Sequence, residues 1–72
     1  MKTVLATGPV TPDATLYIEL VDTPHMPQVV LIVWPVKPTH VRPQAYAETA
    51  SRIMRILARA STELARKRAS EL

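Results

Sequence analysis

The sequence predicts an α+β protein: a two-stranded antiparallel β-hairpin, with a possible third strand at the N-terminus, packed on one long C-terminal α-helix. Residues 44–72 contain neither Gly nor Pro and consist mostly of good helix formers. Two short apolar segments precede them, and prolines separate these segments. We therefore expect a single small domain with an arm or edge strand at 1–12, the hairpin at 14–34, a Pro-rich crossover at 35–42 and the helix at 43–70.

The N-terminal segment is the least defined of these elements. Residues 2–7 include two adjacent apolar side chains, which is compatible with either a short edge strand or an arm. Gly8-Pro9 and Pro12-Asp13 are pairs typical of turns, so we expect a turn region after this segment.

The two strands of the hairpin differ in their patterns. In the first, residues 14–21, Leu16, Ile18 and Leu20 alternate with other side chains, as in a strand with one buried face. The second, residues 28–34, is apolar at every position from Val29 to Trp34, as in strands that are covered on both faces. One helix can cover only one face of the sheet, so we expect a second copy of the chain to cover the other face.

The small size of the chain also favours self-association. A chain of 72 residues buries only about 60–65% of its unfolded surface, and such chains are usually stabilised by disulfides, a metal or oligomerisation. There is no Cys, and His25 and His40 are the only imidazoles. We therefore expect no disulfide, no structural metal and no cofactor, and a homodimer or higher oligomer as the folded unit.

Along the helix, the larger apolar residues recur at spacings of four and three and form one stripe. They are Tyr46, Ala50, Ile53, Leu57, Ala60 and Leu64. A helix over residues 43–70 is about 42 Å long, whereas two strands of six residues reach only about 20 Å. The later stripe residues should therefore extend beyond the sheet. Together with the second strand they form the predicted oligomer interface: Val29, Leu31, Ile32, Val33, Trp34, Leu57, Ala60 and Leu64.

The helix carries the whole net charge of +3, because bases and acids balance over residues 1–42. At 100° per residue, four of its arginines fall within about 60° of one another, on the side away from the apolar stripe. We call them the arginine row: Arg52, Arg55, Arg59 and Arg66. Arginines about one turn apart can contact successive phosphates of a nucleic acid.

This pattern predicts a small regulatory protein that self-associates and contacts the phosphates of DNA or RNA. The expected contacts are the arginine row with Lys67 and Arg68. No zinc finger, helix-turn-helix or RNP motif is present, so base-specific recognition is not expected. Two alternatives remain. In the first, the row is only a solvated helix face that Glu48 and Glu63 partly neutralise. In the second, the protein is an interaction module or inhibitor that binds another protein, such as an acidic one.

Other functional classes find little support in the sequence. There is no glycine-rich phosphate loop, no pair of carboxylates at a spacing suited to catalysis and no nucleophile–base motif, so we expect no enzymatic activity. The longest apolar run, from Val29 to Trp34, has six residues, whereas a membrane span needs about 20. The apolar run after Met1 is too short for a signal peptide core. We expect a cytoplasmic protein without a membrane partner.

Overall fold

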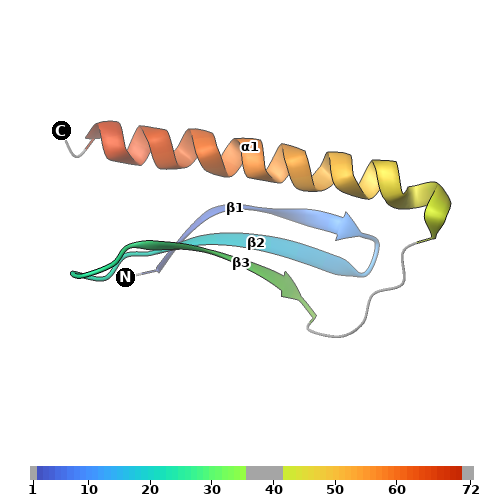
Figure 1. Ribbon diagram of the computed structural model, residues 1–72, viewed down its shortest axis with the longest axis horizontal. Coiled ribbons are helices and arrows are strands. Elements are labelled where there is room, and N and C mark those ends of the chain that lie inside the picture. Colours follow the sequence, from blue (N-terminus) through green and yellow to red (C-terminus); the bar gives the residue numbers. More distant parts are fainter. Residues whose placement is uncertain (1, 36–41, 71–72) are drawn as a thin grey trace.

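The computed structural model describes residues 2–35 and 42–70, which form one sheet and one long helix (Figure 1). The elements are β1 (Lys2–Thr11), β2 (Ala14–Val21), β3 (Gln28–Trp34), the short 3₁₀ helix η1 (Pro43–Ala45) and α1 (Tyr46–Ser70). The strands pair antiparallel in the order β1-β2-β3. The predicted α+β class is confirmed, with the hairpin and the long C-terminal helix in place. Most of the expected crossover lies outside the described residues.

Of the two alternatives for the N-terminal segment, the edge strand is the one present: β1 has ten residues, and the possible third strand of the sheet is formed. It continues through Gly8 and Pro9, and the chain turns at Pro12-Asp13. A turn at Gly8-Pro9 was therefore a wrong prediction. Proline is tolerated there because β1 is an edge strand, where a missing N–H need not break a ladder hydrogen bond. Two irregularities in its register, after Val4 and after Pro9, interrupt the pairing with β2.

The core lies between α1 and one face of β1 and β2. In β2 every second residue is buried, as its alternating pattern predicts. In α1, Ile56 and Ala60 are buried, and Ile53 and Leu64 pack against the core while remaining partly exposed. The buried apolar residues are Leu5, Ala6, Val10, Ala14, Leu16, Ile18, Leu20, Ile56 and Ala60.

The helix lies close to β1 at Gly8. A Cβ atom at this position would lie 3.1 Å from Ile56 Cδ1 and 3.1 Å from Arg59 Nη2. Both distances are shorter than ordinary van der Waals contact. Gly8 is therefore needed for packing and not for a turn, because a residue without a side chain lets the helix lie directly on the strand.

α1 is rotated relative to the stripe that the sequence predicts. Ile56, which is not part of that stripe, is only 2% exposed, whereas Leu57 is 40% exposed. Ala60 was expected to extend beyond the sheet, but it is buried. The reason is the length of β1: ten residues span about 34 Å, close to the roughly 37 Å of the 25-residue helix.

The molecule is elongated. Its radius of gyration is 13.9 Å and its principal extents are 45 × 21 × 14 Å, whereas a compact domain of this length has a radius of gyration of about 11 Å. No helix in the described part of the chain combines the length and the apolar character that crossing a membrane requires.

Candidate interaction surfaces

The helix leaves one side of the sheet uncovered. α1 packs on β1 and β2, and within the described residues no Cα atom of the helix lies within 8 Å of a Cα atom of β3, the strand farthest from it (Figure 1). On β3, Val29, Leu31 and Val33 pair with the buried residues of β2 and so share the face that the helix covers elsewhere. Beyond the helix they are 44–53% exposed.

One flank of the helix, on the side where β3 is left uncovered, also exposes apolar residues. Tyr46 and Leu57 are exposed apolar residues that lie about 80–100° around the helix from Ile56. Leu64, on the same flank, lines a hollow together with Leu20 of β2, so this flank faces β2 and β3 rather than β1. We define the open side by five exposed apolar residues: Val29, Leu31, Val33, Tyr46 and Leu57.

The two edges of the sheet differ in their protection. The β1 edge has two register irregularities and a proline, and Arg59 Nη2 donates a hydrogen bond to the carbonyl oxygen of Thr7 at 3.1 Å. Bulges, prolines and charged side chains are the devices that keep an edge strand from pairing with another chain. The β3 edge has none of them: it pairs with β2 without interruption, and Gln28–Trp34 contains neither a charge nor a proline.

The other face of β3 is also apolar. Val30 and Ile32 are half-buried, and Trp34 is 61% exposed. Ile32 pairs with Tyr17 on β2. The prediction that this strand is apolar on both faces holds, but the structure covers neither face completely. The predicted interface residues Val29, Leu31, Val33, Trp34 and Leu57 are exposed, Ile32 and Leu64 are half-buried, and Ala60 belongs to the core.

The arginine row lies on the opposite flank of the helix, above β1. Arg52, Arg55 and Arg59 line a shallow hollow with Gly8 and Pro9, and Arg66 lines the next hollow along β1. All charged residues of the helix between positions 46 and 66 fall within about 80° around its axis. They are Glu48, Arg52, Arg55, Arg59, Glu63 and Arg66. Up to Arg66, the charge of α1 therefore lies on the side away from β3.

Most of the arginine row already has partners within the protein. Arg52 Nη2 lies 2.5 Å from Glu48 Oε1, and Arg66 Nη1 lies 2.9 Å from Glu63 Oε1. Arg59 is the donor to Thr7 described above. Arg55 is exposed and, among the described residues, makes no hydrogen bond or ion pair. Exposed ion pairs contribute at most about 1 kcal/mol, so a phosphate can compete for these arginines.

Of the two further basic residues, Arg68 does not join the row. It lies about 180° around the helix from the row's centre and lines the hollow beside Leu20 and Leu64. Lys67 lies between the two flanks and lines hollows on both. The six predicted nucleic-acid contacts therefore do not form one surface.

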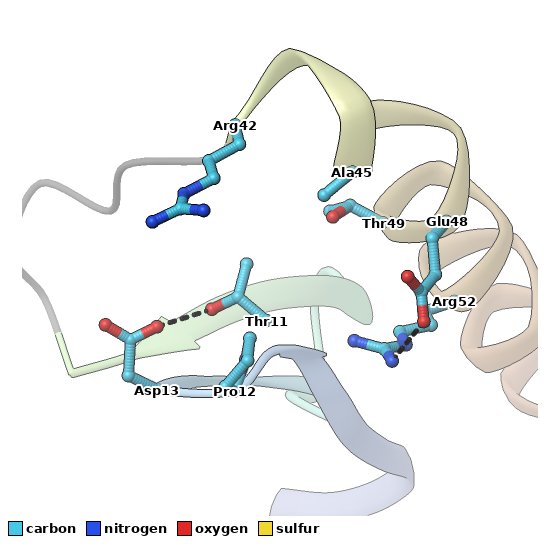
Figure 2. Close-up of a pocket in the computed structure, with 8 residues that line it drawn as sticks. All are labelled: Thr11, Pro12, Asp13, Arg42, Ala45, Glu48, Thr49 and Arg52. Carbon is cyan, nitrogen blue, oxygen red and sulfur yellow. Dashed lines mark hydrogen bonds and ion pairs between the residues drawn. The ribbon is translucent and has the colours of Figure 1, made fainter.

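A further hollow of about 430 Å³ lies between the β1–β2 turn and the start of the helix (Figure 2). Its lining comprises Thr11, Pro12, Asp13, Arg42, Ala45, Glu48, Thr49 and Arg52. Thr11 Oγ1 donates to Asp13 Oδ1 at 2.9 Å, and Arg52 pairs with Glu48, so these polar groups are engaged with one another. None of the described residues that line the hollow is a His or a Cys. Among the described residues, no group of three or more His, Cys, Asp or Glu side chains is placed to hold a metal ion.

Comparison of the chain with protein families, with characterised proteins and with solved structures found no match. Functional conclusions therefore depend on the surfaces described above.

Proposed function

We propose that this protein is a non-enzymatic interaction module that binds another polypeptide chain through its open side and the adjoining β3 edge. The observation that supports this proposal is the exposure of an uninterrupted apolar strand at an unprotected sheet edge. Such an edge offers unpaired backbone N–H and C=O groups to a further strand. An exposed apolar patch beside it excludes water when a partner binds.

The charge distribution is consistent with binding on this side. The charged residues of α1 up to Arg66 lie on the opposite flank, so a partner that approaches β3 need not desolvate them. A partner chain can therefore bury apolar side chains at a favourable free energy of about 25 cal/mol for each Å² of apolar surface.

The change Leu31→Lys is expected to abolish whatever association the wild-type protein shows, because burying an unpaired charge costs several kcal/mol. This corresponds to at least tenfold weaker binding. Self-association is measured by sedimentation velocity, and binding of other proteins by affinity capture from nuclease-treated lysate.

Val4→Lys is the matched control. Val4 is 54% exposed and Leu31 is 53% exposed, and both are aliphatic strand residues, but Val4 lies on β1. This variant is expected to associate as the wild type does. Full association of Leu31→Lys, or an equal loss in both variants, contradicts the proposal.

Nucleic-acid binding is the second candidate function. The observation that favours it is that the arginine row faces away from the open side, so a chain bound at β3 leaves the row exposed. Because phosphate contacts carry no base information, this binding should depend little on sequence.

Each phosphate contact should contribute about −0.9 to the slope of log K against log salt concentration for duplex DNA. Arg55→Gln is expected to make this slope shallower by about one unit. Arg68→Gln, on the other flank of α1, serves as the control and should leave the slope unchanged. The affinities of the wild type and of both variants are measured by fluorescence anisotropy with labelled duplex and single-stranded oligonucleotides. No affinity at about 50 mM salt excludes this candidate, since non-specific electrostatic binding is strongest at low salt.

A further inference from the structure

We infer that the occupant of the β3 edge is a second copy of this chain, paired antiparallel β3 to β3 about a two-fold axis. This rests on the proposed function, and it names the partner. The axis stands perpendicular to the sheet, so the two copies form one continuous six-stranded antiparallel sheet with both helices on the same face. A two-fold contact of this kind uses the same surface patch twice and therefore requires only one complementary surface.

The first argument is the surface area. The chain has 5647 Å² of accessible surface, whereas a compact monomer of 8.0 kDa has about 4,450 Å². The excess of about 1,200 Å² exceeds the roughly 800 Å² that each partner buries in a standard stable interface. The surface that this elongated protein exposes is therefore large enough for a dimer interface.

The second argument is the contrast between the two edges. Both β1 and β3 are edge strands, but β1 is blocked by Pro9, by its irregular register and by Arg59, whereas β3 is regular and uncharged over seven residues. A strand of this composition, left open, is an aggregation site that proteins normally protect. Closed pairing with an identical strand removes that liability, because a two-fold contact does not propagate.

The third argument is the absence of charge within β3 itself. Partners that differ from each other are usually selected by complementary charges, and β3 carries none. Two copies with a net charge of +3 each can still meet there, because the arginine row lies on the far flank of α1. The two basic residues nearer the open side, Lys67 and Arg68, line a hollow that is also lined by the acidic residue Asp22. At physiological salt, charges separated by more than about 8 Å are largely screened.

The test combines molecular mass with hydrogen exchange at each amide. In an antiparallel strand, alternate N–H groups point to opposite sides. In a monomer, the β3 amides that point away from β2 exchange rapidly. In the inferred dimer they should exchange at least about tenfold more slowly at high protein concentration than at low concentration. Light scattering should give twice the 8.0 kDa of the chain.

A charge within β3 should separate the copies. Ile32→Lys places like charges on adjoining strands, while the flexible stem of the lysine still covers Tyr17 on the neighbouring strand. The expected result is a folded monomer, and Thr7→Lys on the blocked β1 edge should remain dimeric. The exchange measurement uses the wild-type protein and so remains decisive if Ile32→Lys fails to fold.

Two results overturn this inference. One is a monomer at every concentration up to about 1 mM, where even a weak dimer would form. This result leaves the proposed function in place if Leu31→Lys still abolishes the capture of another protein. The other is a dimer whose outward β3 amides exchange as rapidly as those of the dilute protein, because the copies then meet on another surface.

Discussion

Replacing Ile56 with Ala should destabilise the protein more than any other single truncation on the helix. Ile56 is 2% exposed and packs between α1 and the sheet. Truncation of a buried Ile to Ala typically costs about 2–5 kcal/mol. A chain of this length has a total stability of only about 4–11 kcal/mol. The expected loss is therefore a large fraction of the total, and the thermal midpoint should fall by more than about 10 °C.

Met54→Ala provides the comparison, because Met54 is on the same helix but 68% exposed. It should change the free energy of unfolding by no more than about 0.5 kcal/mol. Urea denaturation followed by far-UV circular dichroism measures both variants. Equal losses in the two variants would mean that the helix packs on the sheet with a different face.

Replacing Gly8 with Val should also destabilise the protein, by about 1–3 kcal/mol, because the added side chain overpacks the contact between β1 and α1 at this position. Replacing glycine restricts the unfolded chain, which opposes this effect, but by no more than about 1 kcal/mol. The Cβ atom alone would lie 3.1 Å from Ile56 Cδ1, and the two methyl groups of valine require still more space.

A second change tests the cause of this loss. Ile56→Val removes the Cδ1 atom that the new side chain meets, so the double variant should be more stable than the sum of the two single effects predicts. Thr7→Val, an exposed neighbour on β1, should lie within about 0.5 kcal/mol of the wild type. Strict additivity in the double variant would show that Gly8 and Ile56 are not in contact.

The sequence predicted those features of the fold that depend on local patterns. The alternation of Leu16, Ile18 and Leu20 identified the buried face of β2, and the proline-free C-terminal segment identified the helix. The rotation of that helix was not predictable in the same way. Apolar residues occupy an arc of about 120°, from Ile56 to Ala50, and the position of β1 decides which part of the arc is buried.

The conformation of β1 around Gly8 and Pro9 was also not predictable from the local sequence pattern. Gly8 and Pro9 are typical turn residues, and nothing in their immediate neighbourhood distinguishes a turn from a strand. Their actual roles depend on residues about 50 positions away: Ile56 and Arg59 approach Gly8, and Arg59 bonds to Thr7. Such a role becomes visible only when the helix is placed on the sheet.

The candidate surfaces were predictable to different degrees. The alignment of Arg52, Arg55, Arg59 and Arg66 follows from the helix period alone, and the structure places them along one flank. The same period would have separated Arg68 from the row. Val29, Leu31 and Val33 were predicted to lie at an interface between copies, but their place on the face that the helix covers elsewhere was not predictable. A lateral shift of the helix toward β1 leaves no trace in the sequence.

The order of elements along the chain has a consequence for synthesis on the ribosome. The whole sheet precedes α1, so all three strands are complete about 36 residues before the end of the helix that covers β1 and β2. At 5–20 residues per second, this interval lasts about 2–7 s. During that time the nascent chain exposes Leu16, Ile18 and Leu20 in addition to β3. Exposed apolar segments of this kind make incompletely synthesised chains prone to associate with one another, so we expect chaperones that bind apolar segments to raise the yield of this protein.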